Sequence, residues 1–135
     1  FIMADIDHFK EINDRYGHSI GDKVLQEVAK GIVSQCRVID LPARYGGEEF
    51  AVTVPDETAQ GATVLAERCR QAIAEAQVIV GDQEVRVTAS FGVASAVDVL
   101  SVGALVKAAD DALYQAKHAG RNRTMMAATA IPVEM

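Results

Sequence analysis

Apolar residues in this sequence change their spacing along the chain, and these changes limit the possible folds more than any other feature. Four segments place apolar residues every three or four positions, the spacing of an amphipathic helix. Between the helices lie β-rich runs over residues 1–5, 39–45, 50–54 and 78–80, and the clearest strand, from Val85 to Val93. Strands and helices that alternate in this way predict one domain of the α/β (α+β) class.

Capping and turn residues indicate where these elements end. The helices are expected to begin after Asp7, Gly21, Pro55 and Ser101. Asp7 and Ser101 can act as N-caps, and Gly17 and Gly120 are suited to ending a helix. Pro42 predicts that its strand lies at an edge of the sheet or carries a bulge.

Length and composition are those of one globular domain. The chain has 135 residues, of which 50% are hydrophobic and 24% are charged. We assign the domain to residues 1–126 and a loose tail to residues 127–135. The sequence has no initiator Met and opens within a predicted strand, so we expect it to be a fragment of a longer protein.

Charge and hydropathy argue against two classes of partner. The formal net charge is −6 and no run of Lys and Arg occurs, which argues against nonspecific nucleic-acid binding. No apolar run approaches the about 18 residues of a membrane span, so we expect no membrane contact from this domain. Cys36 and Cys69 lack metal-ligand spacing and fall in helical patterns, which is typical of buried thiols in a reducing cytoplasm.

The first cluster of chemical interest runs from Asp5 to Lys10, where a strand passes into a helix. Carboxylates at such a sheet edge can hold a hard cation such as Mg²⁺. For Asp7 we favour the role of helix cap. Asp5 comes too early in the chain to be that cap, and a metal-binding role is at least as plausible for it.

The second cluster is Gly46-Gly47-Glu48-Glu49, between two β-rich runs. The glycines predict a hairpin that a bulky ligand can approach closely. Repulsion between the two acids is costly unless they share a cation. Taken alone, a solvated hairpin tip explains the cluster better.

Two further groups carry charge or base-reading capacity. Lys117 lies at a predicted helix C-terminus, where the helix dipole already favours a cation, whereas a phosphate-binding role is about as plausible for Arg121 beyond the helix. Asn13 and Asp22 could recognise guanine, with Asp22 accepting from ring N–H groups. The alternative is that Asp22 caps a helix, and for His18 we favour a packed core position.

In this order, the motifs closely resemble the GGDEF family of diguanylate cyclases, from residue 1 to about residue 125. The matching segments are Asp5-Ile6-Asp7-His8-Phe9-Lys10, Asn13-Asp14, Gly17-His18, Gly21-Asp22, Arg44-Tyr45-Gly46-Gly47-Glu48-Glu49-Phe50, Ala109-Asp110, Ala112-Leu113-Tyr114, Ala116-Lys117 and Gly120-Arg121-Asn122. Family domains begin several tens of residues earlier, with a helix and an Asp-x-Leu-Thr turn that this sequence lacks.

The resemblance implies a central, mostly antiparallel five-stranded sheet flanked by helices, as in nucleotide cyclases and polymerase palms. It also implies condensation of two GTP into cyclic di-GMP and two pyrophosphates. The reaction would depend on Mg²⁺, or Mn²⁺ in its place, and would occur in a homodimer that joins through its catalytic faces.

The resemblance further implies roles for individual residues. Asp5, the carbonyl of Ile6 and Glu48 would hold the metal, with Glu49 assisting, and Glu48 would help to deprotonate the attacking 3′-hydroxyl. The substrate-binding residues would be Phe9, Lys10, Asn13, Asp22, Lys117 and Arg121. Of these, Asn13 and Asp22 would recognise guanine. Lys10, Lys117 and Arg121 would neutralise the triphosphate, and Lys10 would stabilise the transition state.

The resemblance also implies a product-binding site at Arg37-x-x-Asp40, and five residues lie between this motif and Gly46. Arg68 would be the third member of the site. A plain surface ion pair is the alternative for Arg37 and Asp40. For the whole domain, the alternatives are a non-catalytic cyclic di-GMP receptor acting through these three residues and a GTP-binding regulatory module attached to a phosphodiesterase domain.

Overall fold

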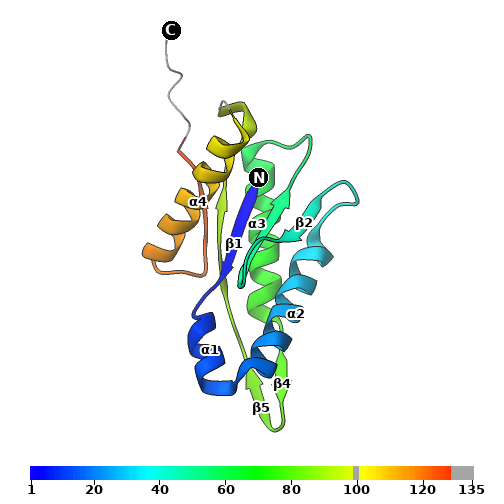
Figure 1. The fold of residues 1–135 in the computed structure, drawn as a ribbon. Helices are drawn as coiled ribbons and strands as arrows, with labels where there is room; N and C mark the ends of the chain where they lie inside the picture. Colours follow the sequence, from blue (N-terminus) through cyan, green and yellow to red (C-terminus); the bar gives the residue numbers. More distant parts are fainter. Residues whose placement is uncertain (99–100, 129–135) are drawn as a thin grey trace.

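The fold is seen in a computed structural model that describes residues 1–98 and 101–128 (Figure 1). Most of the predicted tail, residues 129–135, lies outside this part. The elements in chain order are β1 (Ile2–Ile6), α1 (Phe9–Tyr16), α2 (His18–Gln35), β2 (Leu41–Arg44), β3 (Glu49–Thr53), α3 (Ala59–Glu75), β4 (Val78–Val80), β5 (Gln83–Val85), β6 (Ala89–Val93), a 3₁₀ turn (Ala96–Asp98), α4 (Val102–His118) and β7 (Thr124–Met126).

The predicted sheet of five mostly antiparallel strands is confirmed. Its strand order is β2-β3-β1-β6-β7, and β4 and β5 form a separate hairpin. All pairings in the main sheet are antiparallel except that of β6 with β7. The strand that contains Pro42 lies at the edge, as predicted, where a missing backbone N–H costs least.

Helices cover both faces of the sheet, so the central strands are buried on both sides. Helices α2 and α3 pack on one face through a large apolar core, which α1 joins from beyond the end of β1, and α4 covers the other face through a smaller core (Figure 1). Every residue of β1 and β6 is buried. A methyl group on Gly92 of β6 would collide with the backbone of Ala109 and Leu113, so the missing side chain lets α4 lie directly on the sheet.

The strand predicted from Val85 to Val93 is divided, with residues 86–88 outside any strand between β5 and β6. Within β6 the apolar and polar residues do not face different environments, because Ser90 and Gly92 are as buried as their neighbours. The short parallel strand β7 was not predicted. Its pairing with β6 is set by the return of the chain after α4 rather than by its own sequence.

Several helix boundaries differ from the predictions. Asp7 does not cap α1: the N-cap residue is His8, at a left-handed φ of 56°, and its side chain makes no capping bond. Helix α2 begins at His18 rather than after Gly21, so Asp22 lies inside it and is not its cap. His18 is exposed and not part of the core. Ser101 caps α4 as predicted, by accepting from the N–H of Ala104 at 3.1 Å.

Candidate active site

Three elements meet at one end of the sheet and form a small cavity. They are the end of β1, the tip of the β2–β3 hairpin and the C-terminal end of α4. The N–H of Ile6 donates to the carbonyl of Glu48 at 3.2 Å, which holds the hairpin tip beside the end of β1. The cavity has a volume of about 190 Å³ and is lined by Asp5, Ile6, Asp7, His8, Phe9, Lys10, Glu11, Glu48, Lys117 and Arg121. Most residues implied in metal and phosphate binding are thus brought together.

Glu49 is separated from this cavity. In the antiparallel register it lies opposite Asp5, and it lines a second cavity of about 160 Å³. Asp110 and Tyr114 of α4 also line that second cavity. Asp5 and Lys117 line both cavities, so their ion pair borders the two cavities.

The cavity holds more negative charge than its cations balance. Lys117 donates to Asp5 at 2.5 Å, yet burial raises the pKa of Asp5, and the charges of Asp7 and Asp110 raise it further. Burial also raises the pKa of Glu48, with a further contribution from Asp5. A bound dication would oppose both effects, because it favours the ionised carboxylates.

The donor groups fit a hard divalent cation. The carboxylates of Asp5 and Glu48 and the backbone of Ile6 line one cavity, and all would offer oxygen, the ligand atom that Mg²⁺ and Mn²⁺ prefer. In the described part of the chain, no group of three or more His, Cys, Asp or Glu side chains could hold a metal by itself. Mg²⁺ is usually bound by one or two carboxylates together with substrate phosphates and water.

The residues implied in guanine recognition come from α1 and α2. A methyl group on Gly21 would collide with Oδ1 of Asn13, so the side chain of Asn13 reaches across to α2 beside Asp22. The same methyl position lies 3.4 Å from the ring of Phe9. Phe9 also lines the cavity at the end of β1, so it lies between the two parts of the candidate site.

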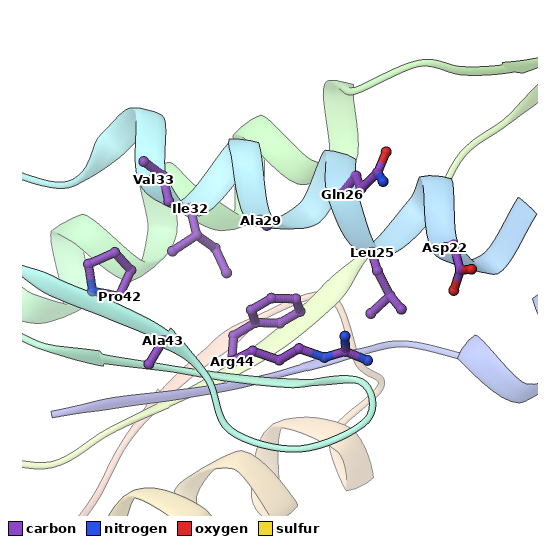
Figure 2. A pocket seen from close by; sticks show the side chains of 10 residues that line it. Asp22, Leu25, Gln26, Ala29, Ile32, Val33, Pro42, Ala43 and Arg44 are labelled. Atoms are coloured by element: carbon purple, nitrogen blue, oxygen red, sulfur yellow. The ribbon is translucent and has the colours of Figure 1, made fainter. Parts of the chain in front are cut away.

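Asp22 opens onto a groove of about 540 Å³ between α2 and β2 (Figure 2). In Figure 2, Asp22, Leu25 and the guanidinium of Arg44 lie at one end of this groove, and Val33 and Pro42 lie at the other. The groove is therefore polar at the end near the hairpin tip and apolar at the far end.

Arg44 has a structural role at the hairpin tip that sequence reasoning missed. Its Nε donates to the carbonyl of Gly46 at 3.1 Å, and its Nη2 donates to the carbonyl of Gly47 at 2.6 Å. These bonds fix the turn that carries Glu48. A cation two residues before a Gly-Gly turn was the available signal. Asp110 was noted within a matching segment but was given no role, although it precedes Lys117 by two helical turns on the same face of α4.

The three residues implied in product binding lie near one another, away from the cavity. The Arg37 guanidinium donates to Asp40 Oδ1 from Nη2 at 2.9 Å, and the Arg37 backbone N–H donates to Oδ2 at 2.7 Å. These bonds hold the pKa of Asp40 below its usual range, and the charge of Arg68 adds to the effect. Arg68 itself donates to the carbonyl of Gln35 at 2.8 Å. Asp40 is buried, so the pair is not a plain surface ion pair.

In residues 1–98 and 101–128, no helix is both long enough and apolar enough to span a membrane.

Comparison with curated proteins places the chain among known domains. The family model described as "Diguanylate cyclase, GGDEF domain" matches residues 1–123. Diguanylate cyclase A of Treponema denticola is 46% identical over 132 residues, which cover 97% of this chain and 36% of that protein. Response regulator PleD of Caulobacter vibrioides is 48% identical over 124 residues, covering 90% of this chain and 27% of that protein. The chain thus spans only about a third of the length of these relatives.

Solved structures share the fold. One is the diguanylate cyclase SiaD of Pseudomonas aeruginosa in complex with its activator SiaC, with 40% identity and a TM-score of 0.89 over 93% of this chain and 48% of that chain. Another is the GGDEF domain of DgcB from Caulobacter crescentus in complex with c-di-GMP, with 35% identity and a TM-score of 0.86 over 93% of this chain and 75% of that chain. The motifs, the fold and the family match over residues 1–123 together show that this chain belongs to the GGDEF family of diguanylate cyclase domains.

Proposed function

We propose that this chain is the catalytic domain of a diguanylate cyclase, which condenses two GTP into cyclic di-GMP with release of two pyrophosphates. The observation that carries the proposal is the cavity at the end of β1, where the carboxylates of Asp5 and Glu48 face the cations Lys10, Lys117 and Arg121. A triphosphate and a divalent cation together would satisfy both sets of charges.

Asp5, Glu48 and the carbonyl of Ile6 would hold Mg²⁺, or Mn²⁺ in its place. When bound, the ion would offset phosphate charge and lower the pKa of a nearby hydroxyl. Glu48 accepts the proton of the attacking 3′-hydroxyl. Lys10, Lys117 and Arg121 bind the triphosphate, and Lys10 stabilises the charge that develops as pyrophosphate leaves. The ion pair of Lys117 with Asp5, at the proposed metal site, supports this role for Lys117.

The reaction requires two domains. The 3′-oxygen of each GTP bonds to the α-phosphorus of the other GTP, and the bond from that phosphorus to the departing pyrophosphate breaks. Each domain holds one GTP, so two copies must face each other through their cavities as a homodimer. The position of the cavity at one end of the sheet, with Lys10 and Arg121 exposed, is compatible with this arrangement.

Asn13 and Asp22 would select guanine. Asp22 accepts from the N1–H and N2–H groups of guanine, whereas Asn13 supplies the complementary donor and acceptor. Adenine lacks those two donors, so it would leave Asp22 without a partner. The contact of Asn13 with Gly21, next to Asp22, supports a joint role.

Cyclic di-GMP would also bind at Arg37, Asp40 and Arg68 and inhibit the enzyme. Arg37 and Arg68 are both exposed and could pair with phosphate or guanine. Asp40 already accepts from Arg37 with both oxygens, so its function would be to orient that guanidinium. The complex of the DgcB GGDEF domain with c-di-GMP supports cyclic di-GMP as a ligand of this family.

Product analysis tests the proposal. The protein is incubated with GTP and Mg²⁺, and the products are identified by chromatography and mass spectrometry. Glu48→Ala should abolish cyclic di-GMP formation while circular dichroism stays unchanged. Glu27→Ala, which removes a glutamate that pairs with Lys30 on α2, serves as the matched control and should retain activity. A folded wild-type protein that binds cyclic di-GMP but forms none from GTP would be a receptor, and the proposal would be rejected.

A further inference from the structure

We propose that Asp7 is a positioning residue that holds Arg121 in the phosphate-binding cavity by anchoring the loop after α4. The inference rests on the proposed function, because it takes Arg121 as a phosphate ligand. Asp7 was expected to cap α1, and the structure leaves that role to the backbone around His8. The carboxylate of Asp7 is instead directed at other parts of the chain.

Asp7 is 4% exposed, and neutral donors surround its carboxylate. The hydroxyls of Thr88 and Ser90 each donate to it at 2.7 Å. The backbone N–H of Asn122 donates to it at 3.0 Å. Asp7 also donates its own N–H to the carbonyl of Thr88 at 2.9 Å. One buried side chain therefore connects the end of β1, the start of β6 and the loop after α4.

Backbone strain gathers around this anchor. In residues 1–98 and 101–128, the non-glycine residues with positive φ are His8, Asp56, Arg121 and Asn122. Three of these four adjoin Asp7: His8 follows it directly, Asn122 donates to it, and Arg121 precedes Asn122. Their φ angles are 56° for His8, 61° for Arg121 and 46° for Asn122. Such conformations persist only where surrounding contacts determine them.

A second contact holds the loop from another side. Nη1 of Arg70 on α3 donates to the side-chain oxygen of Asn122 at 2.9 Å. This contact restrains the Asn122 side chain, whereas Asp7 restrains the backbone. The left-handed conformation of Arg121 depends on the backbone, and it is Arg121 that lines the cavity with Asp5 and Glu48. The N–H of Arg121 donates to the carbonyl of Ala116 at 3.0 Å, so α4 holds the near side of this residue. The Asp7 bond to the N–H of Asn122 holds its far side. Without the Asp7 bond the peptide after Arg121 loses its anchor, and the position of Arg121 is less fixed.

The first test measures the anchor itself. Asp7→Asn keeps the shape of the side chain but removes its charge, and so weakens acceptance from three donors. Hydrogen exchange should show loss of protection at the Asn122 amide, with the central amides of α4 unchanged. Asp111→Asn is the matched control, because that aspartate pairs with Lys107 on the exposed face of α4. Its exchange pattern should equal that of the wild type.

The second test measures binding. Asp7→Asn should weaken binding of a non-hydrolysable GTP analogue about tenfold, which corresponds to about 1.4 kcal/mol. It should leave binding of GMP, which lacks the two terminal phosphates, unchanged. In an Arg121→Ala background, Asp7→Asn should cost no further affinity for the analogue, because the two residues act through one contact.

The outcomes separate this inference from the proposed function. An Asn122 amide that stays protected in Asp7→Asn, or an equal loss of analogue affinity with and without Arg121, overturns the inference. Wild-type protein that binds neither nucleotide overturns the proposed function, and the exchange measurement still tests the anchor. If Asp7→Asn does not fold, Thr88→Val removes a single donor and should give the same changes at smaller size. If Thr88→Val changes neither the protection of the Asn122 amide nor the affinity for the GTP analogue, the inference is also contradicted.

Discussion

Asp5 and Asp40 are both buried carboxylates beside a cation, yet their pKa values move in opposite directions. Their exposed fractions are similar, 7% and 4%. Asp40 accepts from the guanidinium and the backbone N–H of Arg37, and its pKa is lowered. Asp5 has only Lys117 against burial and two neighbouring acids, and its pKa is raised. The same kind of pair is thus electrostatically complete at Asp40 and short of positive charge at Asp5.

This difference separates a carboxylate whose charge is already balanced within the fold from one that is suited to binding a cation. A carboxylate with saturated hydrogen bonds gains little from a further cation. A buried carboxylate that its neighbours repel gains much, and unmet charge of this kind is typical of functional sites. The comparison predicts that substitutions at Asp5 affect catalysis most and that those at Asp40 affect stability.

The largest expected effect is that of Asp5→Asn on synthesis. The substitution removes one of the two carboxylates proposed to hold the metal, and cyclic di-GMP formation should fall by about 10²- to 10³-fold. Initial rates across a range of Mg²⁺ concentrations provide the measurement. The matched control is Asp111→Asn, the exposed aspartate on α4. Near wild-type rates in Asp5→Asn would show that the raised pKa has no connection with catalysis.

The next effect is that of Arg37→Ala on product inhibition. Removing an exposed guanidinium that would pair with cyclic di-GMP should raise the inhibitory concentration about ten- to a hundredfold. The measurement is initial rate against added cyclic di-GMP. Arg15→Ala is a suitable control, because the guanidinium of that arginine lies over the ring of Tyr16 on α1. Unchanged inhibition would restrict Arg37 to a structural role beside Asp40.

Much of the fold could be predicted because local patterns determine it. The edge position of the strand with Pro42, the hairpin at Gly46-Gly47 and the cap at Ser101 all depend on a few adjacent residues. The strand β7 could not be predicted, since three residues pair with β6 only after α4 has returned the chain. The same limit applies to Asp7, whose side chain resembles a helix cap in sequence while its partners Thr88 and Asn122 are distant in the chain.

The candidate site divides in a similar way. The cluster after β1 and the acids at the hairpin tip were recognisable, because charged residues stand where a strand ends. Their charge balance was not, because it depends on Lys117 and Asp110 of α4 approaching Asp5 from far along the sequence. Nor could the sequence place Glu48 and Glu49 in different cavities, since that follows from the register of β3 against β1.

The smallest expected effect concerns stability and its dependence on pH. Asp40→Asn should lower the free energy of unfolding at pH 7 by about 1 kcal/mol, the usual worth of one hydrogen bond. Because folding lowers the pKa of Asp40, its stabilisation is complete above the unfolded value of about 3.9 and is lost as the pH falls through the folded value. Urea unfolding should therefore show a difference between wild type and variant that shrinks below about pH 4.

The matching measurement on Asp5→Asn, made with EDTA present, should have the opposite sign. Folding raises the pKa of Asp5, so its ionised form opposes folding at pH 7, and this cost disappears as the pH falls and the carboxyl is protonated. Asp5→Asn should accordingly unfold at a urea concentration no lower than that of the wild type at pH 7, and any gain should vanish in acid. If both variants lost stability at pH 7 to the same extent, Asp5 and Lys117 would form an ordinary stabilising pair. The contrast between Asp5 and Asp40 would then be rejected, because both carboxylates would stabilise the fold.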